Sequence, residues 1–106
     1  MDNLTPLRNQ YLELTNQILP ALANERKLPV RFNHCFQRIV LDNLFGCCWY
    51  KVLSRKQPAY KQLSKEQLEK AIAIAQSMID QPDEYIRQLN QNSLNWRGKD
   101  RPSRSA

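Results

Sequence analysis

Hydrophobic residues are densest in residues 30–53, VRFNHCFQRIVLDNLFGCCWYKVL. They recur there at steps of three and four, which is the spacing of a helix face, and a second stripe runs beside the first through Leu41, Phe45 and Trp49. A helix that is hydrophobic around most of its circumference packs at the centre of a small domain. The pattern predicts a central helix over residues 32–53, which Gly46 weakens and can break into two.

The N-terminal segment also has a helical pattern. Thr5 and Pro6 are typical of a helix start, with threonine as the cap and proline in the first turn. Pro20 falls inside the hydrophobic pattern that follows. Because proline cannot donate a backbone hydrogen bond, we expect the helix to kink or stop near Leu19 and to resume as a short turn through Arg26.

Two more helices are predicted in the C-terminal half. The residues 54–62, SRKQPAYKQ, form a basic loop. Ser64 and Gln67 have the spacing of a capping box and begin a helix over residues 64–79 with one clean hydrophobic face. A last helix is predicted over residues 82–93, with Trp96 just beyond it.

Composition supports an all-α fold. The chain has 106 residues, which is the size of one domain, and only two glycines, fewer than a β-rich fold of this size needs for its turns. We therefore predict a bundle of about four helices over residues 1–97 and a disordered, basic tail over residues 98–106. The sequence contains no stretch of about 18 uncharged hydrophobic residues, and its polar beginning is unlike a secretory leader. A cytoplasmic protein with reduced cysteines and no membrane contact is the expectation; its oligomeric state is left open.

The net charge of +6 is concentrated in the C-terminal half. Residues 1–53 hold six basic residues against four acidic ones, and residues 54–106 hold ten against six. A basic balance of this kind suits a polyanionic partner, and it is equally compatible with solubility and a disordered tail alone.

His34 and the three cysteines are residue types that bind zinc or form nucleophile–base pairs. On a continuous helix, however, Cys35 and Cys47 would lie about 18 Å apart, too far for one ion. A sharp break at Gly46 is needed for either chemistry. The cysteines are therefore interpreted as buried structural residues, and no catalytic residue, metal or cofactor is assigned.

Arg38 and Asp42 are charged residues inside the hydrophobic segment, one helical turn apart. Buried charges are costly unless they are paired, so the pattern predicts an internal ion pair between them. The alternative is that His34, Arg38 and Asp42 line a polar pocket for a small anion or a partner.

Basic and aromatic residues occur together in the loop and near the C-terminus. Single-stranded nucleic acids are bound by aromatic side chains that stack on bases, beside lysines and arginines that contact phosphates. The candidate nucleic-acid-binding residues are Arg55, Lys56, Tyr60, Lys61, Trp96, Arg97 and Lys99. Tyr60 and Trp96 can instead pack the loop and the tail onto the core.

The strings PVRFNHCFQRIVLDNLFGCCWY, PAYKQLSKEQL and NSLNWRGK resemble a family of small cyanobacterial proteins of about this length. Members are often named GNAT-type N-acetyltransferases, so the resemblance implies a bacterial cytoplasmic protein and, by the name, acetyl-CoA as a substrate. GNAT domains are mixed α/β folds with a glycine-rich pyrophosphate loop, and we can match no catalytic or cofactor residue to this chain.

Three functions follow from these patterns. The first is binding of a polyanion, RNA or DNA, through the basic loop and tail. The second is a protein–protein adaptor or assembly factor with an exposed hydrophobic helix face, and the third is the N-acyltransferase that the family name implies. The residues favour binding over catalysis.

Overall fold

The computed structural model describes residues 3–28, 30 and 33–98, and within these ranges the chain forms helices and turns without a strand. The all-α fold predicted from the sequence is confirmed. The predicted basic tail, with Lys99, lies outside the described residues except for Gly98, as does Phe32 at the start of the predicted central helix. Along the chain the elements are α1 (Thr5–Glu13), the π-helix η1 (Leu14–Ile18), α2 (Leu19–Arg26), α3 (Asn33–Phe45), the 3₁₀-helix η2 (Trp49–Lys51), α4 (Ala59–Gln62), α5 (Lys65–Asp80) and α6 (Asp83–Arg97).

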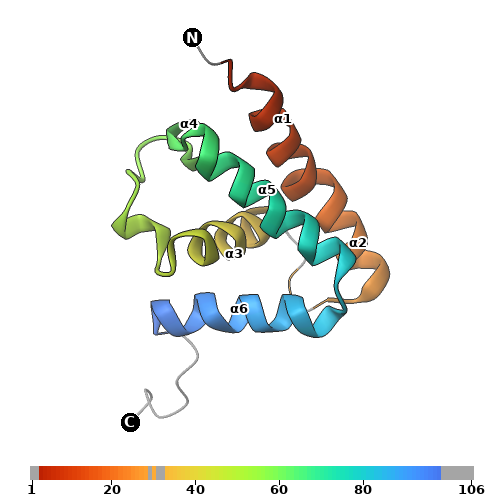
Figure 1. Cartoon of the computed structure of the whole chain (residues 1–106). Helices are drawn as coiled ribbons and strands as arrows, with labels where there is room; N and C mark the ends of the chain where they lie inside the picture. Colours follow the sequence, from red (N-terminus) through yellow and green to blue (C-terminus); the bar gives the residue numbers. More distant parts are fainter. Residues whose placement is uncertain (1–2, 29, 31–32, 99–106) are drawn as a thin grey trace.

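Helix α3 lies at the centre of the arrangement (Figure 1). It packs against α6 on one side, and against α5 and the η1–α2 segment on others. Helix α1 lies along α5, and α5 turns sharply into α6. The C-terminal end of α6 and the connection from α3 to α4 lie at the same end of the molecule, on the left of Figure 1.

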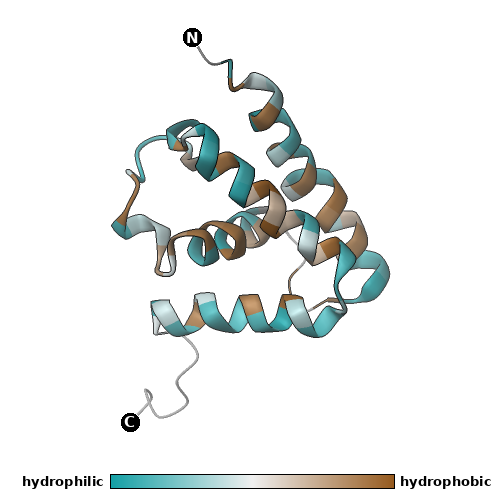
Figure 2. Ribbon diagram, in the orientation of Figure 1, coloured by the Kyte–Doolittle hydropathy of each residue, from teal (hydrophilic) through white to brown (hydrophobic). Residues whose placement is uncertain are grey.

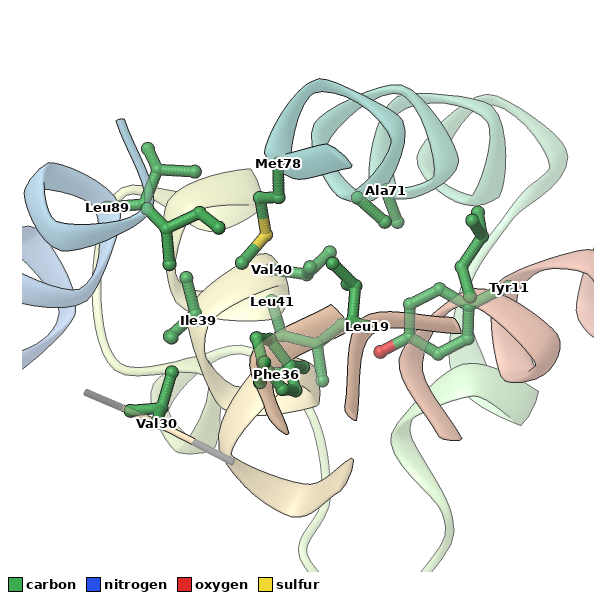
Figure 3. Close-up of a cluster of buried hydrophobic side chains, with 14 of the residues drawn as sticks. Tyr11, Leu19, Val30, Phe36, Ile39, Val40, Leu41, Ala71, Met78 and Leu89 are labelled. Carbon is green, nitrogen blue, oxygen red and sulfur yellow. The ribbon is translucent and has the colours of Figure 1, made fainter. Parts of the chain in front are cut away.

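The core lies where α1–α2, α3 and α5 meet. Phe36, Ile39 and Val40 of α3 have no solvent exposure, and Figure 3 shows them among Leu19, Met78 and other hydrophobic side chains from the neighbouring helices. Helix α6 is more hydrophilic than α3 and carries only isolated hydrophobic positions (Figure 2). The prediction of a hydrophobic helix at the centre is therefore confirmed.

The central helix is shorter than predicted. Helix α3 ends at Phe45, and Gly46 follows with a φ of 70°, in the left-handed region that ends many helices. The backbone N–H groups of Gly46 and Cys47 both donate to the carbonyl of Asp42, at 2.8 and 3.2 Å, and thereby close the helix end. The sequence left open one weakened helix over residues 32–53 or a break at Gly46, and the structure shows the break: glycine acts as the stop signal, and a turn leads from α3 to η2.

Pro20 widens the first helix without ending it. The N–H of Leu19 donates to the carbonyl of Leu14, five residues earlier, so the turn before the proline is a π-helical one. A wider turn accommodates the proline, which has no N–H and whose ring would otherwise meet the carbonyl one turn earlier. Helix α2 continues from there to Arg26, where a short turn was predicted.

The last two helices show one confirmed boundary and one correction. Ser64 and Gln67 form the predicted capping box, in which each side chain accepts a hydrogen bond from the other residue's backbone N–H. Helix α6, predicted to end at Ser93, extends to Arg97 and is terminated by Gly98 with a φ of 69°. Trp96 and Arg97 therefore lie on a helix, in fixed positions relative to α3.

Tyr11 is fully buried, and among the described residues its hydroxyl has no hydrogen-bond partner. Burial raises the pKa of this phenol above its ordinary value, because the ionised form loses its hydration. Figure 3 shows the ring within the core, near Leu19.

We expect Tyr11→Phe to raise the free energy of unfolding by about 1 kcal/mol, because it removes a buried hydroxyl without a partner and keeps the ring. Urea denaturation measures the change. Tyr85→Phe, at a partly buried tyrosine of α6, is the matched control and should stay within about 0.5 kcal/mol. A loss of stability in Tyr11→Phe would mean that the hydroxyl makes a favourable interaction.

Helices of the described residues are all too short or too polar to cross a membrane.

A candidate anion-binding pocket

An open pocket of about 570 Å³ lies between the C-terminal end of α6 and the turn that follows α3. Three of its lining residues are basic and two are aromatic. Its walls are formed by Cys48, Tyr50, Lys51, Arg55, Trp96 and Arg97. Three of these six, Arg55, Trp96 and Arg97, belong to the group predicted from the sequence to bind nucleic acid.

Asp42 holds both walls of the pocket in place. Its carboxylate is fully buried and accepts two hydrogen bonds from Arg97, from Nε at 2.7 Å and from Nη2 at 3.1 Å. It also accepts one from the backbone N–H of Trp49 at 2.9 Å, at the beginning of η2, the segment that carries Tyr50 and Lys51. One buried carboxylate thus connects the end of α6 to the turn after α3.

The predicted pair of Arg38 with Asp42 is replaced by a wider network. The salt bridge of Asp42 is made with Arg97, whose side chain is only 10% exposed. Arg38 donates instead to Ser93 Oγ at 2.6 Å and to Asn90 Oδ1 at 2.8 Å, and Ser93 donates onward to Asp42 at 2.6 Å. The prediction of a direct pair is wrong because α6 brings a guanidinium and a hydroxyl between the two residues.

The two arginines of this network differ in their electrostatics. The two hydrogen bonds that Arg97 donates to the Asp42 carboxylate raise the pKa of Arg97 above its ordinary value, which fixes its positive charge. Burial lowers the pKa of Arg38 below its ordinary value. The neighbouring positive charge of Arg97 lowers it further, and the negative charge of Asp42 acts in the opposite direction. The charge of Arg97 is compensated by Asp42, so it contributes little net charge to the pocket.

Tyr50 orders the basic side chains around it. The guanidinium carbon of Arg55 lies 4.2 Å from the centre of the Tyr50 ring, and that of Arg97 lies 4.9 Å from it. Both distances are within the range of cation–π attraction. Trp49 contacts the same ring edge-on, with 4.6 Å between the ring centres.

The loop that carries Arg55 is fastened by Gln62. The side chain of Gln62 accepts a hydrogen bond from the N–H of Ser54 at 2.9 Å and donates to the carbonyls of Ser54 and Gln57 at 2.8 and 3.1 Å. These bonds close residues 54–62 into a compact turn. Arg55 is therefore held over Tyr50 by a folded loop.

The other predicted binding residues lie elsewhere. Tyr60, on α4, packs against the hydrophobic core, which favours its role as a packing residue over a stacking one. Lys61 is exposed on α4, and its carbonyl accepts a hydrogen bond from Arg8 of α1 at 3.3 Å. Lys56 is exposed in the loop but does not line the pocket.

Three pocket residues, Cys48, Tyr50 and Lys51, were not in the predicted group because the predicted helix ran through them. Gly46 is the residue from which they could have been predicted. If the helix ends at this glycine, the chain turns, and the aromatic and basic residues that follow no longer belong to the central helix. His34 is exposed on α3, and none of His34, Arg38 and Asp42 is among the residues that line this pocket, so a polar pocket lined by these three residues stays a prediction.

The cysteines are placed on α3 and after it. Cys35 and Cys47 are partly buried, and Cys48 is buried and lines the pocket. Within the described ranges, no three histidine, cysteine or acidic side chains gather closely enough to hold a metal ion.

Comparison of the chain with family models, with curated proteins and with solved structures finds no significant match.

Proposed function

We propose that this protein binds a nucleic acid, RNA or DNA, and that the pocket at the end of α6 is the contact site. The main support for the proposal is the composition of the pocket lining. Two cationic side chains, Lys51 and Arg55, line the same pocket as two exposed aromatic residues, Tyr50 and Trp96. Phosphate-contacting cations beside aromatic rings are the common features of sites that bind nucleic acids without reading much sequence.

The charges of the pocket support an anionic ligand. Arg97 is paired with Asp42, whereas within the described part of the chain no carboxylate lies within salt-bridge distance of Lys51 or Arg55. Among the described residues, these two cations therefore face an open pocket without a carboxylate partner. An anion that enters it gains attraction without breaking an existing ion pair.

We expect the double variant Lys51→Gln, Arg55→Gln to bind single-stranded RNA or DNA at least about tenfold more weakly than the wild type at low salt, because two phosphate contacts are lost. Fluorescence anisotropy with a labelled mixed-sequence pool measures this affinity. The control is the double variant Lys65→Gln, Lys70→Gln, which removes the same charge from exposed positions of α5 and should bind like the wild type. Equal losses in both double variants would show that net charge, and not the pocket, determines binding, and no binding by the wild type would refute the proposal.

A protein partner is the second candidate. Of the four large hydrophobic side chains that are exposed among the described residues, Tyr50, Val52 and Trp96 belong to the pocket or to the turn beside it. An adaptor function predicts that a protein co-purifies with the wild type and is lost on Val52→Ser, which leaves the cations intact. The N-acyltransferase hypothesis implies a mixed α/β domain, and the described residues supply no sheet for it.

A further inference from the structure

We infer that the pocket binds one unpaired nucleotide, with its base against Trp96 and its phosphate near Lys51 and Arg55, so that the protein selects single strands over duplexes. This inference rests on the proposed function and makes it more specific. It assigns different roles to the two pocket aromatics, which the sequence does not distinguish.

Both pocket aromatics are exposed, Tyr50 by 42% and Trp96 by 37%, but among the described residues only the Tyr50 ring is covered by cations. Tyr50 already has two guanidiniums over its ring, those of Arg55 at 4.2 Å and of Arg97 at 4.9 Å, and Trp49 at its edge. A base would have to displace these cations to stack on Tyr50. Trp96 lines the same pocket with 37% of its surface exposed, and it is held by the last turn of α6.

The size of the pocket agrees with a single nucleotide unit. Its volume of about 570 Å³ lies within the range of small-molecule sites, about 300–1,000 Å³. In a duplex the faces of the bases are covered by their neighbours, so a base reaches a side chain in a pocket only after it is unpaired and unstacked, at a cost of a few kcal/mol. A single strand does not have to break base pairs.

Asp42 connects the two segments that form this site, the end of α6 and η2. Its bonds to Arg97 and to the N–H of Trp49 fix the separation between the end of α6, which carries Trp96, and η2, which carries Lys51. The base surface and the phosphate-binding cations are therefore positioned before a ligand arrives. Preorganisation of this kind lowers the cost of binding.

The test compares three labelled ligands of the same length on the full-length protein: an oligothymidylate, a strand of the same charge that lacks bases, and a mixed-sequence duplex. We expect the oligothymidylate to bind about fivefold to a hundredfold more tightly than the strand without bases, which is the range measured for one stacked base. The duplex should bind no more tightly than the strand without bases, although its charge is larger.

Trp96→Ala should remove the preference for the strand with bases, and Trp96→Phe, which keeps an aromatic ring, should retain most of it. Circular dichroism establishes that both variants are folded. If the three ligands bind equally, or if Trp96→Ala keeps the preference, the nucleotide assignment is overturned while the nucleic-acid proposal stands. If no ligand binds to the wild type at low salt, both are overturned.

Discussion

Replacing Asp42 with alanine is expected to lower the free energy of unfolding by about 3–5 kcal/mol, the typical cost of removing one partner from a buried ion pair. The carboxylate is fully buried, and its loss leaves the Arg97 guanidinium, the Ser93 hydroxyl and the Trp49 N–H without their acceptor. Domains of this size have stabilities of about 5–15 kcal/mol, so the variant is expected to be marginally stable.

Urea denaturation followed by circular dichroism measures this effect. Asp42→Asn keeps an acceptor oxygen but no charge, so it should fall between the wild type and Asp42→Ala. Glu69→Ala removes a carboxylate from an exposed position of α5 and should change stability by less than about 0.5 kcal/mol. A loss of unfolding free energy below about 1 kcal/mol in Asp42→Ala would contradict the claim that Asp42 holds the end of α6 against the turn after α3.

The second large effect is expected for Phe36→Ala, with a loss of about 3–5 kcal/mol. Phe36 is fully buried in α3, and Figure 3 places it next to Leu19 and Leu41. The substitution removes a ring from the place where α3 meets the η1–α2 segment, and the surrounding helices cannot close the cavity completely.

The melting temperature reports this loss, and we expect it to fall by more than about 10 °C. Phe36→Leu, which fills much of the same volume, should cost less. Val52→Ala, at a valine that is 51% exposed, is the surface control and should be nearly neutral. A small effect of Phe36→Ala would mean that α3 is not the centre of the core.

Local signals in the sequence were enough for most of the fold. The capping box at Ser64 and the hydrophobic stripe of α5 depend on residues within a few positions of one another, and both are confirmed. The errors occur where a local signal has two meanings. A glycine inside a helix weakens it, whereas a glycine with a positive φ ends it. The sequence does not decide between these outcomes at Gly46, where the structure shows a positive φ.

The site was predicted only in part because it is assembled from distant segments. The candidate group contained Arg55, Trp96 and Arg97, which the structure brings together, and Lys56, Tyr60 and Lys61, which it places elsewhere. The partner of Asp42 is 55 residues away along the chain. Spacing rules address neighbours on one helix, and therefore favoured Arg38, one turn away, over an arginine on a helix that packs against α3.

The most direct test of the proposed site is the salt dependence of single-strand binding, compared between the wild type and single variants at the pocket cations. For single strands, log K falls with log salt with a slope of about −0.7 for each phosphate that the protein neutralises. We expect Lys51→Gln and Arg55→Gln each to reduce the magnitude of the slope by about 0.7, and Lys70→Gln to leave it unchanged. A slope that stays the same in the pocket variants would contradict the account, because the phosphates would then be bound elsewhere on the protein.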